Sequence, residues 1–361
     1  MYQYFYTLLF VPLLSVIAFL PFFRGLKFQT IIATLLSWIT VLGLLIFRDV
    51  HAPADYLSYI SIYDGMSGID SVLNAYQGDV TFAVFLHIGK LLGLDGETFF
   101  IVFSVVNTVI LFLGFKYLFP TQKYVIFSFL LFVLTSTFVL MFTNAIRQGL
   151  SIALFILAIG LHSRSHKLTS YLIIVSAIFS HSSIIPFACF FALRSYFVER
   201  KINYRVILLA IPFCFFIGYS LLDILSLYFN KFQMMIIYDD VAYGKTQIYL
   251  KALILYLFGV LFYVYGNKYE NFGIYGYKSV FDIYLFGLII VFSALPVLFI
   301  ASRFVYHISA LVPLLLTYVF FSKRNAFNVE VRAVVYFIGM LMYGFSVYNF
   351  PSIQSQLTES Y

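Results

Sequence analysis

The sequence predicts an all-α integral membrane protein with about twelve transmembrane helices. Of its 361 residues, 63% are hydrophobic and only 10% are charged, whereas soluble domains are about 45–50% apolar and about 25% charged. Apolar runs near the length of about 20 residues that crosses a bilayer recur along the whole chain, and tyrosines gather near their ends, as interfacial belts require. These observations exclude a large soluble domain, and we expect residues 1–361 to form a single polytopic membrane domain.

Twelve apolar runs are the candidate spans. In chain order they are Tyr4–Phe23, Thr30–Phe47, Thr98–Leu118, Tyr124–Phe142, Gly149–His162, Leu168–Phe179, Ile184–Leu193, Val206–Phe229, Ala252–Gly266, Ser279–Ile300, Phe304–Phe321 and Ala333–Phe350. The two short runs that flank His181 fit either two half-helices or one bent helix. Residues 80–94 are also apolar but contain His87 and Lys90, so we expect an interfacial or re-entrant helix there.

The basic residues predict which side of the membrane each loop faces. Fifteen of the 22 Lys and Arg residues lie in one set of alternate loops, and seven lie on the opposite side. Because cytoplasmic loops carry the excess of Lys and Arg, the first set is cytoplasmic. The outer loops then cover about residues 48–80 and 230–251, and Arg147, His181 and Arg303 face outward. The net charge of +7 reflects this loop bias, and we expect no nucleic-acid partner.

Three short polar clusters interrupt the apolar runs near their ends, at residues 144–149, 181–183 and 302–303. An ionisable group in a membrane segment costs roughly 2.5–3.5 kcal/mol on insertion scales, so it usually lines a cavity and has a function there. Two cations and one titratable imidazole on the same face suit an anionic lipid phosphate. We therefore predict that the three clusters converge on one outward-facing cavity.

Arg147 has no acid nearby in the sequence, and its polar neighbours Asn144 and Gln148 are neutral. A guanidinium without a carboxylate partner can offer its five donors to phosphate oxygens. The alternative is an interfacial arginine that only anchors the end of a helix. Arg303, at the start of a predicted span, leaves the same two interpretations open.

His181 lies at a break between two short apolar runs and is a candidate base, because an unperturbed imidazole pKa near 6.5 suits proton uptake at neutral pH. The alternative is a hydrogen-bonded structural histidine. We expect Ser182 and Ser183 to satisfy backbone groups at the break, since no G-x-S-x-G elbow surrounds them. In the first outer loop, Asp55 and Tyr59 fit a helical turn that holds sugars, or an ordinary solvated loop.

Motifs for nucleotide and metal chemistry are missing from the sequence. It contains no Walker motif, no G-x-G-x-x-G at a strand–helix join, no C-x-x-C, no H-E-x-x-H and no D-x-D. We expect no cofactor and no metal ligand, and an activated lipid-linked donor fits better than ATP or a nucleotide sugar. The two cysteines, Cys189 and Cys214, lie inside apolar runs and are expected to pack as small hydrophobic residues.

The chain resembles the EpsG-like branch of the Wzy-type bacterial polysaccharide polymerases, which make O-antigen and capsule. The resemblance covers most of the chain and rests on four motifs in order: Arg48 with Asp55-Tyr56-x-x-Tyr59, Asn144-x-x-Arg147-Gln148, His181-Ser182-Ser183 and Ser302-Arg303-x-x-Tyr306. It implies a GT-C-like helical bundle in the bacterial cytoplasmic (inner) membrane, with its active site facing the periplasm or exterior. It also implies a metal-independent glycosyltransferase that joins undecaprenyl-pyrophosphate-linked glycan repeat units.

The resemblance also implies roles for individual residues. Arg147 and Arg303 would hold the donor pyrophosphate and stabilise the leaving group, and His181 or Asp55 would accept the proton of the acceptor hydroxyl. The remaining substrate-binding residues would be Arg48, Asn144, Gln148, Tyr59 and Tyr306. The implied partners are undecaprenyl-pyrophosphate-linked glycans, membrane lipids and, as a candidate, a chain-length regulator. Two other functions remain open: a flippase for lipid-linked oligosaccharides, and an O-antigen ligase.

Overall fold

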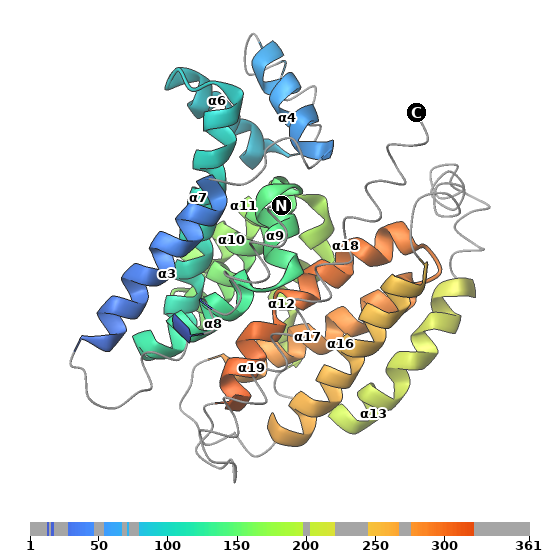
Figure 1. Cartoon of the computed structure of the whole chain (residues 1–361). Helices are drawn as coiled ribbons and strands as arrows, with labels where there is room; N and C mark the ends of the chain where they lie inside the picture. The colour runs from blue at the N-terminus through green and yellow to red at the C-terminus, as the bar shows by residue number, and fades with distance from the viewer. Residues whose placement is uncertain are drawn as a thin grey trace. The chain divides into compact units, whose positions relative to one another are not determined.

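The computed structural model describes residues 28–46, 54–66, 79–197, 203–220, 245–266 and 276–320, together with residues 13, 16, 17 and 71. Within these residues all regular elements are helices, without strands (Figure 1). The predicted all-α class is confirmed. The chain divides into two compact units, the first of which comprises Met1–Ile185, Ile274–Gly276 and Asn325–Asn349. That the whole chain forms one polytopic domain stays a prediction.

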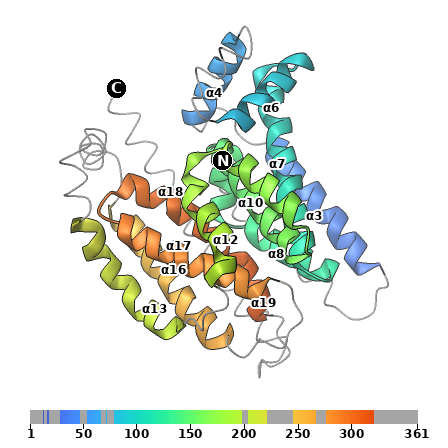
Figure 2. The same cartoon turned by 180° about the vertical axis from the view of Figure 1, so that it is seen from behind.

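The first unit is built around α10, which is buried along most of its length. This helix packs against α7 and α11, and α3 packs against α7 and α8 (Figures 1 and 2). A Cβ atom on Gly160 would lie only 2.8 Å from the carbonyl oxygen of Gly114, so two glycines permit the close contact of α7 and α10. The helices of this unit are α3 Gln29–Ile46, α4 Ala54–Gly65, α6 Val80–Leu91, α7 Gly96–Leu118, α8 Gln122–Val133, α9 Ser136–Thr143, α10 Ile146–Ser163, α11 Lys167–Ile178 and η3 Ser182–Ile184.

The second unit packs α16 beside α13 and α17, and α17 beside α18 (Figures 1 and 2). Within it, Asp282 of α17 accepts hydrogen bonds from Arg194 Nε and from Tyr204 Oη, both at 2.8 Å. This buried carboxylate therefore joins α12, α13 and α17. The helices are α12 Ile185–Phe197, which belongs to this unit from Pro186 onward, α13 Tyr204–Ala210, η4 Ile211–Phe213, α16 Lys245–Gly266, α17 Tyr277–Ala294, α18 Leu298–Ser309 and α19 Val312–Phe320.

Four helical segments of the described part are long and apolar enough to cross a membrane, and several shorter apolar helices accompany them. The four are Gly96–Leu118, Ile146–Ser163, Tyr277–Ala294 and Ile300–Phe320. Together with the apolar composition they make this a membrane protein. The predicted span Ala333–Phe350 lies outside the described residues, as does Tyr4–Phe23 apart from residues 13, 16 and 17.

Several predicted boundaries are corrected. The expected helix Tyr124–Phe142 is two helices, because Thr135 ends the first by bonding to Phe132 O and caps the second by accepting from Phe138 N at 3.1 Å. Helix α16 begins at Lys245, within the expected outer loop at residues 230–251. The other outer loop contains α4. The separate helix expected within residues 80–94 is present as α6.

We predict that Asp95→Ala lowers the melting temperature at neutral pH, because Asp95 caps α7. Its carboxylate accepts from Thr98 N at 2.8 Å and Thr98 Oγ1 at 3.0 Å, and these bonds hold the pKa of Asp95 below its ordinary value of 3.8. A depressed folded-state pKa stabilises the fold above the unfolded-state pKa, and this stabilisation is lost as pH falls through the folded-state value. The difference in melting temperature between wild type and Asp95→Ala, measured in detergent, should therefore be present at neutral pH and shrink at acidic pH.

The control for this experiment is Asp95→Asn, which keeps a good N-cap residue without a titratable group. Its melting temperature should lie close to that of wild type at neutral pH. If the melting temperature of Asp95→Ala stays below that of wild type by the same amount at acidic pH, the ionised carboxylate is not the stabilising group.

Candidate functional site

Arg147, in the first turn of α10, is at the centre of a polar cluster in the first unit. Its Nη1 forms an ion pair with Oδ2 of Asp79, and its Nε donates to Tyr59 Oη at 3.3 Å. The guanidinium carbon also lies 5.5 Å from the centre of the Tyr59 ring, which is within cation–π range. The side chains of Arg147 and Asp79 keep 27% and 13% of their surfaces exposed, so both remain accessible.

The position of Arg147 depends on the break between α9 and α10. The first helix ends at Thr143 and the second begins at Ile146. Asn107 Nδ2 of α7 donates to the carbonyl oxygen of Ile146 at 3.3 Å, which fixes the first turn of α10. A Cβ atom on Gly149 would overlap the carbonyl oxygen of Met141, so only glycine allows α9 to lie this close to α10.

Tyr63 and Asp64 fasten α4, and so hold Tyr59 in place, one turn earlier in the same helix. Tyr63 Oη donates to Leu94 O at 3.1 Å, and Asp64 Oδ1 accepts from Gly96 N at 3.1 Å. Burial of the phenol, with the nearby Asp64 carboxylate adding to the effect, raises the pKa of Tyr63 above its ordinary value. The hydroxyl therefore stays protonated and remains a donor to the Leu94 carbonyl.

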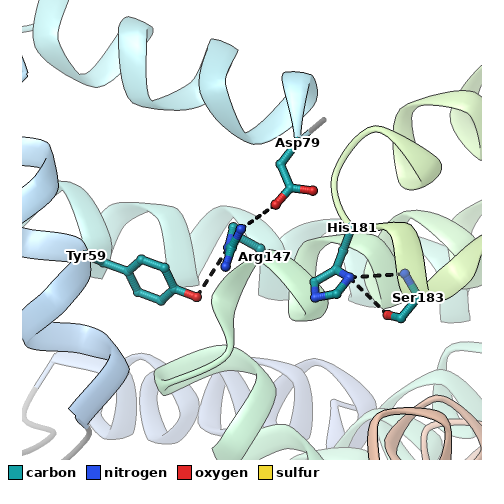
Figure 3. Close-up of polar contacts among 5 residues, drawn as sticks. All are labelled: Tyr59, Asp79, Arg147, His181 and Ser183. Atoms are coloured by element: carbon teal, nitrogen blue, oxygen red, sulfur yellow. Dashed lines mark hydrogen bonds and ion pairs between the residues drawn. The ribbon is translucent and has the colours of Figure 1, made fainter. Parts of the chain in front are cut away.

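His181 lies in the short break between α11 and the 3-10 helix η3. Its Nδ1 accepts from Ser183 N at 3.2 Å and lies 3.1 Å from Ser183 Oγ (Figure 3). A backbone N–H can only donate, so Nδ1 carries the lone pair and the neutral imidazole holds its proton on Nε2. Nε2 of His181 is therefore a hydrogen-bond donor. A base would instead need a free lone pair on this nitrogen, so the neutral ring does not act as a base at Nε2.

The start of α6 connects the Arg147 cluster to the break at His181. Thr81 N donates to Phe179 O at 3.0 Å, and Thr81 Oγ1 donates to Ser176 O at 3.0 Å. These bonds hold the residues after Asp79 against the end of α11, two residues before His181. Since η3 also contacts α10, the ion pair and the imidazole border one region. Figure 3 shows these side chains reaching it from separate elements.

A model of the EpsG family matches residues 31–359. This chain belongs to the EpsG family. The predicted resemblance is thereby confirmed, and the EpsG-family chain is a membrane protein connected with polysaccharide synthesis. Comparisons with curated proteins and with solved structures gave no match.

The second unit of this EpsG-family protein contains the other predicted cation. Arg303 lies in α18, which begins at Leu298, and in the first turn of the candidate span Ile300–Phe320, close to the expected start of a span. His307 Nδ1 donates to the Arg303 carbonyl oxygen at 2.8 Å, and the His307 ring stacks on Phe187. Lys251 Nζ of α16 lies 5.6 Å from the centre of the Tyr306 ring. The predicted convergence of Arg303 with Arg147 and His181 stays a prediction.

The remaining predicted residues have different surroundings. Gln148 is buried and Asn144 is half-buried, both beside Arg147 in the chain. Asp55 lies in the first turn of α4, one turn before Tyr59. Arg48 lies outside the described residues. Among the described side chains, no group of three or more His, Cys, Asp or Glu residues could hold a metal ion.

Sequence reasoning missed one charged group in each unit of this EpsG-family protein. The prediction that Arg147 lacks a carboxylate partner is wrong, because Asp79 pairs with it from 68 positions earlier in the chain. The sequence shows Asp79 directly before an apolar helix. On sequence grounds alone, however, it is one of several acidic residues in the predicted outer loops. Lys251 likewise counts as a loop cation, whereas the structure places it inside α16.

Proposed function

We propose that this EpsG-family protein is a polysaccharide polymerase of the cytoplasmic membrane. It would join undecaprenyl-pyrophosphate-linked oligosaccharide repeat units at the outer face, as a metal-independent glycosyltransferase. The observation that carries the proposal is the Arg147–Asp79 ion pair at the start of α10, with His181 in the neighbouring break after α11 (Figure 3), in a membrane protein of this family. The cluster provides both charge stabilisation and acid–base groups for transfer from a lipid phosphate.

The reaction exchanges one bond at the anomeric carbon of the donor glycan. The bond from this carbon to the terminal phosphate oxygen breaks, and the pyrophosphate leaves with the bonding electrons. A hydroxyl oxygen of the incoming repeat unit forms the new glycosidic bond. Negative charge develops on the departing phosphate, so hydrogen-bond donors already positioned around it lower the activation barrier of the transfer. Arg147 and the Nε2–H of His181 are suited to this role in the first unit, and Arg303 with Lys251 in the second.

The proposed architecture extends beyond the four long helices. We propose that the shorter apolar helices also enter the bilayer, giving the roughly twelve spans and the GT-C-like bundle inferred from the sequence. The helix ends that carry Arg147 and His181 would then face the periplasm or exterior. This side is the one predicted from the excess of basic residues in the loops assigned to the cytoplasm.

A flippase for lipid-linked oligosaccharides is the second candidate function. The observation that favours it is the position of Arg303 and Lys251 within apolar helices α18 and α16, because ionisable residues inside membrane segments often mark a transport path. A ligase would share the chemistry of the polymerase and differ in its acceptor.

Reconstitution distinguishes these functions. Purified protein in proteoliposomes, given a synthetic polyprenyl-pyrophosphate oligosaccharide, should produce a ladder of glycans in whole multiples of the repeat unit, also in the presence of a chelator. Each new bond should release one polyprenyl pyrophosphate. Translocation of the oligosaccharide without growth of the glycan would instead identify a flippase, and transfer only to an unrelated acceptor would identify a ligase.

A further inference from the structure

We infer that Asp79 is the proton acceptor of the transfer reaction, a role that neither the sequence motifs nor the family assigns to it. The inference rests on the proposed polymerase function for the nature of the substrate. It arises from the carboxylate of Asp79, which forms an ion pair with Arg147, and from the tautomer of the neighbouring histidine.

Asp79 has the placement that a general base needs. Its carboxylate is paired with Arg147, and its side chain is 13% exposed, so it is largely removed from water but not sealed. A guanidinium at this distance favours the ionised carboxylate. Oδ2 of Asp79 contacts the guanidinium, and a carboxylate offers about four lone-pair positions over its two oxygens. The group can therefore hold Arg147 and still accept a proton.

His181, one of the two residues expected to be the base, is less well placed. Nδ1 of His181 already accepts from Ser183 N, so the neutral ring carries its proton on Nε2 and acts there as a donor. Asp79 is in direct contact with the predicted phosphate-binding arginine.

The backbone around Asp79 is fixed on both sides of the site. The two hydrogen bonds from Thr81 to Phe179 O and Ser176 O hold the start of α6 against α11. Arg147 in turn is held by Tyr59. A base fixed in this way loses little freedom when the acceptor sugar binds, and effective proton transfer depends on such positioning.

In the proposed step, the acceptor hydroxyl attacks the anomeric carbon of the donor glycan. Its proton passes to a carboxylate oxygen of Asp79, while the bond to the phosphate oxygen breaks and polyprenyl pyrophosphate leaves with the electron pair. Arg147 then faces a neutral Asp79 and an anionic leaving group. Its ion pairing therefore passes from Asp79 to the pyrophosphate during the reaction. The proton returns to solvent or to the pyrophosphate before the next cycle.

The test uses full-length protein in proteoliposomes with a synthetic lipid-linked repeat unit. Asp79→Asn keeps the size and an oxygen that accepts from Arg147 but removes the base. We expect chain extension to fall by about 100-fold or more, as loss of a general base typically does, while binding of the lipid-linked donor stays within about threefold. Asp79→Glu, which retains the carboxylate, should restore part of the rate. Glu97→Gln, an exposed acid in the first turn of α7, is the matched control and should extend chains like wild type.

Chemical rescue gives a second readout that a structural ion pair would not produce. In Asp79→Ala, added formate should restore part of the extension rate, because a small carboxylate can occupy the vacated space and accept the proton. The role of Asp79 would be overturned if the Asp79→Asn and Asp79→Ala variants extended chains within threefold of the wild-type rate. It would also be overturned if Asp79→Ala were folded and inactive and formate left it inactive. Wild-type protein that binds the donor and never extends it would refute the polymerase function instead.

Discussion

Replacing Arg147 by lysine should abolish long glycan chains and leave single repeat units on the lipid carrier, although the positive charge is retained. Arg147 makes an ion pair with Asp79, a hydrogen bond from Nε to Tyr59 Oη at 3.3 Å and a ring contact with Tyr59. An ammonium group cannot reproduce a planar guanidinium with donors on several sides. We expect extension to fall by about 100-fold, comparable with removal of one charge-stabilising donor in other enzymes.

The measurement is the length distribution of surface glycan in cells that carry the variant, compared with extension in proteoliposomes. Lys116→Ala is the control, because Lys116 is an exposed cation in the last turn of α7 and its removal should leave the ladder unchanged. Full-length chains from the Arg147→Lys protein would show that a point charge suffices, and the role of the guanidinium geometry would then have to be abandoned.

Gly149→Ala should prevent accumulation of folded protein. The added methyl group would overlap the carbonyl oxygen of Met141, and this backbone atom can move only if α9 and α10 separate. Overpacking of this kind costs about 1–3 kcal/mol or more, a large part of the stability of most domains. The separation would also displace Arg147, which lies two residues before Gly149 in the same helix, so any residual folded protein should be inactive.

Gly43→Ala provides the comparison for this experiment. Gly43 lies in α3, and a Cβ atom there would meet nothing within 4 Å, so alanine should leave stability unchanged or raise it slightly through its better helix propensity. Fluorescence-detected gel filtration and melting curves in detergent measure both variants. Equal yields and melting temperatures for the two would mean that α9 and α10 are not in the close contact described.

The helices that sequence reasoning located well have clear chemical boundaries. The expected span Thr98–Leu118 is α7, which Asp95 caps at one end and which Pro120 follows at the other. The break between α8 and α9 was missed because Thr135-Ser136-Thr137 is a short run of hydroxyl residues between longer apolar runs. Such residues can also lie inside a helix, with their hydroxyls bonded to a carbonyl of the preceding turn. At α18, the polar pair Ser302-Arg303 resembles a boundary, whereas the helix begins at Leu298, shortly after Pro296.

The candidate site was only partly predictable for a different reason. Arg147 and His181 are conspicuous because they are polar groups beside apolar runs. The partner of Arg147 is not, since 68 positions separate it from Asp79 and periodicity carries no information across that distance. The contact between Ser183 and His181 is local, yet its effect on the tautomer follows from the direction of one backbone N–H, which composition cannot reveal.

The buried carboxylate of Asp282 has a consequence for how the protein enters the membrane. Its side chain is 2% exposed, and it is neutralised by Arg194 from α12 and bonded by Tyr204 from α13. A lone carboxylate in hydrocarbon is costly, and both of its partners precede it in the chain. During synthesis, α12 and α13 are therefore already available when α17 emerges. The earlier helices can therefore pair Asp282 as α17 arrives, and docking adds to the hydrophobicity that already makes α17 a candidate span.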